Sequence, residues 1–142
     1  MIEESGFTLL RDPNRDQLNT ALELTRTGKL TVIRKTTIFY AVDNGLASVE
    51  RALVDLHYEV TRERYPLDAT ELMRIYYNAL TTVSLEYPKM LRYAGLRRFR
   101  SEIEWVLWKF KDRIDIPATY IKKPQSPNKF IRRLPSLDEA LR

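Results

Sequence analysis

LASVERALVDLHYEVTRERYPLDATELMRIYYNALTTV, residues 46–83, is the stretch that decides the fold of this 142-residue chain. Its apolar residues recur at steps of three and four, which is the period of one helix face. Over residues 46–65 they are Leu46, Val49, Leu53, Leu56 and Val60. Tyr65-Pro66 ends this predicted helix, because the residue before a proline is pushed out of the α region.

A second predicted helix begins after this break. Asp68 to Glu71 has the spacing of a capping box, with Asp68 as the cap. The apolar stripe that follows consists of Leu72, Ile75, Tyr76, Ala79, Leu80 and Val83. Pro88 closes this helix or opens the next turn.

Two more helices are predicted on either side of this pair. One covers residues 96–114, with residues 88–94 as a helical lead-in interrupted at Gly95. Its expected buried seam is Phe99, Ile103, Leu107, Phe110 and Ile114, flanked by Trp105 and Trp108. The other covers residues 13–27, between the cap Asp12-Pro13 and the stop Gly28. Residues 30–42 are rich in β-branched and aromatic residues, and strand, linker and helix all stay open there.

Helices of similar length joined by short polar breaks predict an all-α fold. We expect residues 1–115 to form one small antiparallel bundle of three to four helices. Residues 116–142 are expected to form a separate extended, Pro-rich, basic C-terminal arm, because four prolines rule out regular helix through most of it. They are Pro117, Pro124, Pro127 and Pro135. Ser136 to Glu139 has capping-box spacing before one possible terminal turn.

The net charge of +5 lies almost entirely in this arm. Residues 116–142 hold six basic and two acidic residues, whereas residues 1–115 hold 18 basic and 17 acidic ones. Arginine outnumbers lysine by 16 to 8. Guanidinium groups suit phosphate and interface contacts, because their planar donors bind in pairs.

Composition excludes several classes of protein. The chain has no cysteine, so disulfides, thiol nucleophiles and thiolate metal sites are excluded. Its apolar runs are shorter than the ~18 residues of a membrane span. The acidic opening MIEE does not resemble a signal peptide, so we expect a cytoplasmic protein.

No segment predicts catalysis. His57 is the only histidine, and no nucleophile in a recognisable turn accompanies it, so we expect a flanking or solvated His57 and no enzyme. The carboxylate pairs at 59/63 and 102/104 are mixed with basic residues, which indicates charged helix faces rather than a metal site. The four glycines form no nucleotide-binding loop, and no cofactor is expected. An enzyme would be recognised by a pocket around His57 or the paired glutamates.

Two basic segments favour binding of a nucleic-acid backbone. Residues 92–100 interleave arginines with aromatic residues, and the arm has five basic residues between Ile116 and Pro135 with no acidic residue among them. The residues expected to contact phosphates are Arg97, Arg98, Arg100, Lys122, Lys123, Lys129, Arg132 and Arg133. Tyr120 and Phe130 are expected to stack on bases or to anchor the arm.

The leading interpretation is a non-enzymatic, self-associating structural protein that binds nucleic acid without reading its sequence. It would be a packaging or nucleoprotein subunit, in a homo-oligomer or a larger assembly. The alternative is a protein–protein adaptor whose arm clasps a neighbour through apolar anchors. These anchors are Ile121, Phe130, Ile131 and Leu134. The PxxP spacing of Pro124 and Pro127 also matches ligands of polyproline-binding domains, and a disordered solubilising arm stays open as well.

A small helical bundle with an Arg-rich helix and a basic arm is similar in kind to two groups of proteins. These are the coat proteins of archaeal filamentous viruses and the small helical subunits of RNA-guided effector complexes. The likeness lies in architecture and charge and covers no motif. It implies a nucleoprotein role, within a virion in the first case. Such coat proteins often carry their basic arm at the N-terminus, whereas this N-terminus is acidic.

Overall fold

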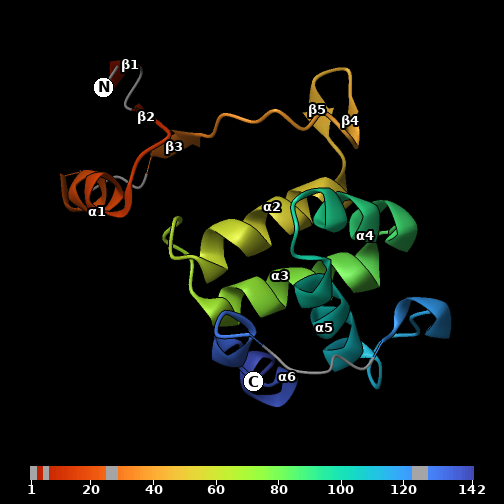
Figure 1. Ribbon diagram of the computed structural model, residues 1–142. Coiled ribbons are helices and arrows are strands. Elements are labelled where there is room, and N and C mark those ends of the chain that lie inside the picture. Colours follow the sequence, from red (N-terminus) through yellow and green to blue (C-terminus); the bar gives the residue numbers. More distant parts are fainter. Residues whose placement is uncertain (1–2, 5–6, 25–28, 123–127) are drawn as a thin grey trace.

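Four helices form the main body of the protein. The computed structural model describes residues 3–4, 7–24, 29–122 and 128–142, and it is mostly helical, with small sheets (Figure 1). The four are α2 (Val49–Thr61), α3 (Ala69–Thr82), α4 (Tyr87–Leu96) and α5 (Arg100–Phe110). α2 packs against α3 and α4, and α4 packs against α5.

Side-chain caps fix where α2 and α3 begin. The Ser48 hydroxyl accepts a hydrogen bond from the Arg51 backbone N–H, and the Asp68 carboxylate accepts one from that of Glu71. Each cap satisfies a backbone donor that the first helical turn leaves open. The predicted start of α3 at Asp68 is therefore confirmed. The predicted start of α2 at Leu46 is wrong, because Leu46 lies in a strand and is 74% exposed.

Most residues of the predicted apolar stripes meet in one core, whereas Val49 and Val83 are each 42% exposed. Its fully buried side chains come from all four helices, and they include Val54, Leu72, Met73, Tyr76, Met90, Ile103, Leu107 and Phe110. Phe99 is also buried, as expected for the seam of the last helix.

The helix predicted over residues 96–114 is interrupted at a different place from the one expected. Gly95 lies inside α4, and the break falls at residues 97–99, where Arg98 has the left-handed φ of 67°. The Arg98 and Phe99 backbone N–H groups bond back to the carbonyls of Gly95 and Ala94, which closes α4. This turn inserts the Phe99 ring into the core and separates Arg97 from Arg100.

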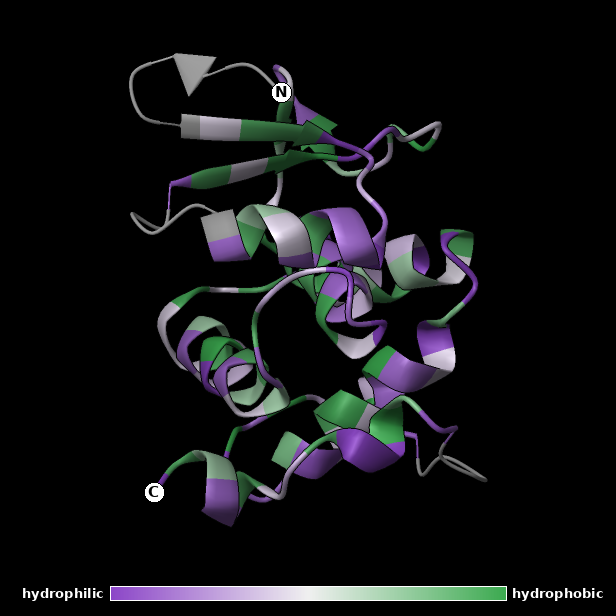
Figure 2. Cartoon of the chain, turned by 90° about the vertical axis from the view of Figure 1, so that its left-hand side faces the viewer, coloured by the Kyte–Doolittle hydropathy of each residue, from purple (hydrophilic) through white to green (hydrophobic). Residues whose placement is uncertain are grey.

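The N-terminal residues form a β-α-β unit that the sequence did not reveal. β1 (Glu3–Glu4) pairs antiparallel with β2 (Phe7–Arg11), and β2 pairs parallel with β3 (Leu30–Ile33). α1 (Arg15–Leu24) connects the parallel strands and lies beside them (Figure 2). Leu18 and Ala21 of the predicted stripe are buried, whereas Leu22 is exposed.

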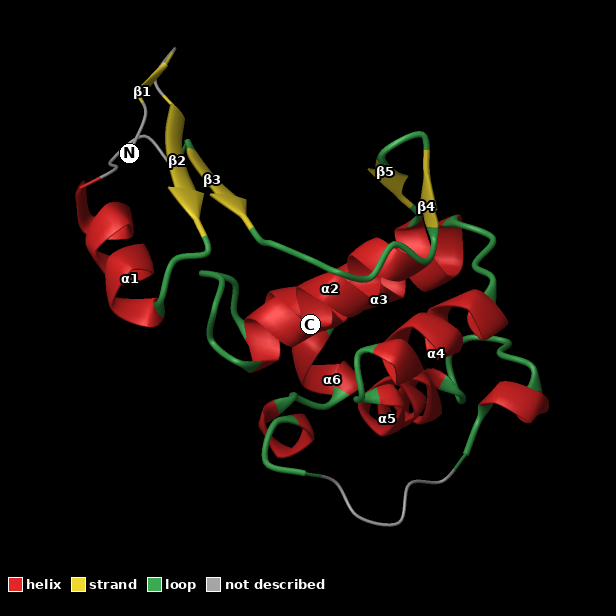
Figure 3. Cartoon of the chain, turned by 45° about the horizontal axis from the view of Figure 1, so that its top comes forward, coloured by secondary structure: helices red, strands yellow, loops and turns green. Residues whose placement is uncertain are grey.

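Residues 34–41, which we call the strap, connect β3 to a small hairpin. The strap runs along α2 (Figure 3), and the hairpin consists of β4 (Val42–Asp43) and β5 (Leu46–Ala47). Asn44 and Gly45 both have positive φ, 48° and 78°, which a two-residue hairpin turn requires. Residues 30–42, left open by the sequence, are therefore strand and then strap.

The described part of the C-terminal segment folds against the helices. It contains two short 3-10 helices, η1 (Ala118–Tyr120) and η2 (Ile131–Arg133), and α6 (Leu137–Ala140), which packs on α3. The Ser136–Glu139 capping box is confirmed. Four residues at steps of three join the core: Ile131, Leu134, Leu137 and Ala140. An extended arm is therefore wrong for residues 128–142, because their apolar side chains find partners on the same chain.

Backbone contacts also hold this segment in place. Arg74 Nε donates to the Ala140 carbonyl at 2.7 Å, and Lys109 Nζ lies 3.4 Å from the carbonyls of Leu134 and Pro135. Arg113 pairs with Asp138. The proline spacing of residues 124–127 lies outside the described residues.

This packing predicts the effect of an Ile131→Ala substitution. Removing a buried isoleucine side chain should lower the free energy of unfolding by about 2–5 kcal/mol. Urea unfolding followed by circular dichroism measures this change. Lys129→Ala, two residues away and exposed, is the control and should change the stability little. An Ile131→Ala variant as stable as the control would mean that the segment does not pack on the helices.

Candidate nucleic-acid interface

Three guanidinium groups surround the ring of Tyr58. Arg62 lies one helical turn further along α2, and its guanidinium carbon is 4.8 Å from the ring centroid. Arg64 approaches from the turn after α2 at 5.5 Å, and Arg97 approaches from the end of α4 at 4.3 Å. Such contacts attract a cation to the ring face, but they do not remove the repulsion between the three charges.

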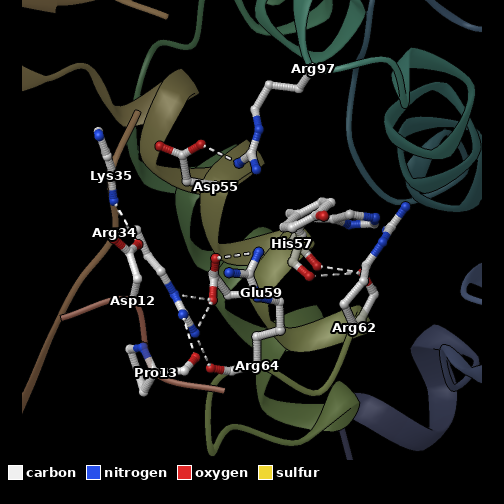
Figure 4. Close-up of polar contacts among 12 residues, drawn as sticks. Asp12, Pro13, Arg34, Lys35, Asp55, His57, Glu59, Arg62, Arg64 and Arg97 are labelled. Carbon is white, nitrogen blue, oxygen red and sulfur yellow. Dashed lines mark hydrogen bonds and ion pairs between the residues drawn. The ribbon is translucent and has the colours of Figure 1, made fainter. Parts of the chain in front are cut away.

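Carboxylates reduce this repulsion by pairing with the guanidinium groups. Asp55 accepts hydrogen bonds from Arg97 at 2.6 Å and from the Tyr93 hydroxyl at 2.5 Å. Glu59 accepts one from Arg34 of the strap at 3.1 Å (Figure 4). These pairs fix the orientation of the arginine side chains before any ligand arrives.

Glu102 is the most buried of these carboxylates, and it joins three parts of the chain. It accepts two hydrogen bonds from Arg62, at 2.6 and 2.7 Å, one from Asn128 at 3.1 Å, and it lies 3.0 Å from His57 Nε2. Burial raises the pKa of the Glu102 carboxyl, but the hydrogen bonds from His57, Arg62 and Asn128 outweigh burial and lower this pKa to about 2. Glu102 is therefore ionised at neutral pH.

His57 is fully buried, and the prediction of a flanking or solvated histidine is wrong. Its ring stacks on Phe99 at a centroid distance of 5.9 Å and meets the edge of Tyr76 at 6.0 Å. Burial lowers the pKa of His57, although the contact with Glu102 acts in the opposite direction. A neutral imidazole that donates from Nε2 to Glu102 fits both facts. This pair could not be predicted from a local pattern, because 45 residues separate the two side chains.

The arginines predicted at residues 97–100 differ in their exposure and contacts. Arg97 is half-buried against Asp55 and the Tyr58 ring. Arg98 is exposed and makes no ion pair with any residue that the structure describes. Arg100 pairs with Glu104 at 2.7 Å on the exposed face of α5. The break at residues 97–99 separates Arg97, at the end of α4, from Arg100, at the start of α5.

The predicted basic residues of the C-terminal segment are mostly exposed. Lys122, Lys129, Arg132 and Arg133 lie at the surface, and Arg133 is 3.5 Å from Glu63. Lys122 follows η1, which lies on the other side of α5 from η2 (Figures 1 and 3). Lys123 lies outside the described residues.

The two predicted stacking residues already contact side chains of the same chain. The Tyr120 ring stacks on Tyr87 at 5.6 Å. The Phe130 ring holds the Arg62 guanidinium at 3.9 Å and the Lys129 ammonium at 5.0 Å. Phe130 therefore extends the arginine cluster of Tyr58, whereas Tyr120 lies apart from it.

No role was predicted from the sequence for several residues of this surface. Arg62 and Arg64, which lie around the carboxylate pair at 59/63, were assigned to a solvated charged helix face, and Tyr58 was assigned no role. The spacing of Tyr58 and Arg62 at i and i+4 was a usable signal, since such pairs face each other on a helix. The approach of Arg97 and Phe130 depends on tertiary packing and left no local pattern. We call Arg62, Arg64, Arg97, Arg98 and Lys129 the arginine face.

A cleft of about 470 Å³ adjoins the arginine face. The strap forms one wall, and α2 and the end of α4 form the other. Arg34 lines the cleft and donates to the carbonyls of Pro13 and Arg64, at 2.7 and 2.9 Å (Figure 4). Arg51 donates to the carbonyls of Ile38 and Tyr40, at 2.7 and 2.8 Å. These two arginines fasten the strap to the helices.

Two kinds of site are not found in the described part of the chain. No group of three His, Asp or Glu side chains there could hold a metal ion. None of the helices in those residues is long and apolar enough to cross a membrane.

Comparisons with known proteins give this surface no assigned role. No protein family, no curated protein and no solved structure matches the chain.

The buried Glu102 predicts how stability depends on pH. The folded-state pKa of about 2 lies below the ordinary 4.5, so ionised Glu102 stabilises the fold above about pH 4.5, and this contribution is lost as the pH falls toward 2. His57 acts in the same direction, because its lowered pKa means that unfolding takes up a proton below pH 6.5. Glu102→Gln should lower the free energy of unfolding at pH 7 by about 3 kcal/mol.

Urea unfolding between pH 2.5 and 7 measures this dependence. Glu102→Gln should also flatten the acid loss of stability below pH 4.5. Glu63→Gln is the matched control, because Glu63 is half-exposed and its ion pairs with Arg15 and Arg133 lie at the surface. Equal acid profiles for wild type and Glu102→Gln would contradict the role assigned to the buried carboxylate.

Proposed function

We propose that this chain is a non-enzymatic structural protein that binds the phosphate backbone of nucleic acid through the arginine face. The observation that supports it most is the grouping of Arg62, Arg64 and Arg97 around the Tyr58 ring. Each guanidinium is held by a side chain of the protein yet keeps N–H donors beyond those that these contacts use. Oriented donors of this kind suit phosphate oxygens.

The exposed cations beside this group extend the proposed contact. Arg98 directly follows Arg97, and Lys129 lies on the Phe130 ring that also holds Arg62. In this proposal a small helical bundle is the scaffold, and the basic C-terminal segment lies over it and adds Lys129, Arg132 and Arg133. The chain would be a nucleoprotein subunit in the cytoplasm or within a virion. Contacts to phosphates carry no base information, so no sequence preference is expected.

This function predicts the salt dependence of binding. If Arg98 and Lys129 contact duplex phosphates, the slope of log affinity against log salt should become shallower by about 1 for Arg98→Gln and for Lys129→Gln. Fluorescence anisotropy with a duplex of mixed sequence measures the slope. Lys111→Gln, at the far end of α5, is the control and should leave the slope unchanged. Salt-independent binding, or no binding to single or double strands, would reject the proposal.

A second candidate is a subunit that associates with copies of itself. The anchors expected for an arm that clasps a neighbour include Ile131 and Leu134, and these are buried in the core of the same chain. A different surface favours association instead, because Phe39 and Leu46 are 76% and 74% exposed on the strap and the hairpin. Large exposed apolar side chains mark a contact site where they form one patch.

Sedimentation measures this association. Phe39→Ser combined with Leu46→Ser should shift a self-associated chain to the mass of a monomer. Neither position belongs to the arginine face. The double variant should therefore still bind the duplex, and the anisotropy change at saturating protein concentration, expressed per monomer, should persist. An unchanged mass for the double variant, or a wild-type monomer at high concentration, would reject this candidate.

A further inference from the structure

The cleft between the strap and the helices contains two kinds of arginine. Arg34 and Arg51 use their donors on backbone carbonyls and on the carboxylates of Glu59 and Asp55. They build the walls of the cleft and offer little to a ligand. Its volume of about 470 Å³ lies within the range of small-molecule sites, about 300–1,000 Å³.

Three other cations of the cleft keep unused donors. The Lys35 ammonium makes no hydrogen bond or ion pair with any residue in the described ranges, since only its backbone N–H is bonded. Among the residues that the structure describes, Arg64 forms one ion pair, in which its terminal nitrogen lies 3.6 Å from a Glu59 oxygen, too far for a hydrogen bond. Arg97 uses one terminal nitrogen on Asp55. All three side chains line the cleft.

The carboxylates of the cleft are more fully engaged than the cations. Asp55 accepts from Tyr93 and Arg97 and faces Arg51, and Glu59 accepts from Arg34. Asp12 has one oxygen bonded to the Lys35 N–H at 2.8 Å, and its other oxygen has no partner among the residues described. The cleft therefore offers several cationic donors, and the second oxygen of Asp12 is available as a carboxylate acceptor.

Asp12 is also held in an unusual conformation. Its φ of 40° is left-handed, and its own N–H donates to the Ile33 carbonyl at 2.8 Å. A left-handed aspartate costs free energy, and such residues gather at functional sites. This backbone conformation places the Asp12 carboxylate at the end of β2, beside the strap.

We propose that this cleft binds a phosphate monoester that also carries hydroxyl groups, as a nucleotide does. The phosphate dianion contacts Lys35, Arg64 and Arg97, and a ligand hydroxyl donates to the free oxygen of Asp12. Both a free mononucleotide and the 5′-phosphorylated end of a strand have this chemistry. The site goes beyond the proposed backbone binding, because Lys35 and Asp12 belong to the cleft and not to the arginine face.

Isothermal titration of the full chain with adenosine 5′-monophosphate tests the site. We expect saturable binding of one nucleotide per chain and no binding of adenosine, which lacks the phosphate. Lys35→Gln should weaken nucleotide binding by about tenfold, since a hydrogen bond to a charged group is lost. Asp12→Asn should weaken the nucleotide but not inorganic phosphate, which has no sugar hydroxyl.

Arg98→Gln is the matched control and separates this site from the proposed function. It should leave nucleotide affinity unchanged while it weakens duplex binding, and Lys35→Gln should do the reverse. Comparing strands with a 5′-phosphate and a 5′-hydroxyl distinguishes the two sources of the ligand. A preference for the phosphorylated strand identifies a strand end, and equal binding of the two strands identifies a free nucleotide.

Three results would overturn the site. They are the absence of saturable nucleotide binding, binding of adenosine as tight as that of the nucleotide, and wild-type nucleotide affinity in Lys35→Gln. Circular dichroism of each variant verifies that the fold is retained, and Lys35 is exposed, so its substitution removes no core contact.

Discussion

The ionised Glu102 carboxylate is the interaction on which the rest of the structure depends. A buried charge is tolerated only where partners replace the water that it loses. Glu102 lies on α5. Its partners are His57 of α2, Arg62 at the C-terminal cap of α2, and Asn128 of the C-terminal segment. One side chain thereby sets the position of α2 against α5 and of the last segment against both, and the guanidinium of Arg62 is fixed where Phe130 covers it.

Local signals predicted the helices and failed at the segments between them. Residues close in sequence determine the caps at Asp68 and Ser136 and the apolar stripes of α2, α3 and α5. These features could therefore be predicted. The strands of residues 7–11 and 30–33 are short and satisfy each other across an intervening helix. Leu46 continued the α2 stripe in sequence, but the Asn44-Gly45 turn placed it in a hairpin instead. The step of three from Ile131 to Ala140 is present in the sequence, but the prolines led to the prediction of an extended arm instead.

The candidate site was less predictable, because its parts come from distant segments. The count of charges identified the C-terminal segment as basic, and Lys129 was named from that segment. Arg97 and Arg98 were named from the arginine-rich residues 92–100. The Tyr58 ring, which gathers the guanidinium groups, was not. Nor could composition show that Arg34 and Arg51 are structural while Lys35 has unused donors, since this difference depends on which carbonyls lie within reach.

The strap determines how the N-terminal unit would respond to mechanical force. Its residues 34–41 form no β-ladder within the described ranges, and the Arg51 guanidinium satisfies the carbonyls of Ile38 and Tyr40 in place of a neighbouring strand. Arg34 adds bonds to Glu59 and to the Arg64 carbonyl. Tension on the N-terminus would therefore act on side-chain attachments to the helices rather than on a β-ladder. A lysine at position 51 could not replace both contacts with the same geometry, because a planar fork is needed to hold two carbonyls and a carboxylate at once.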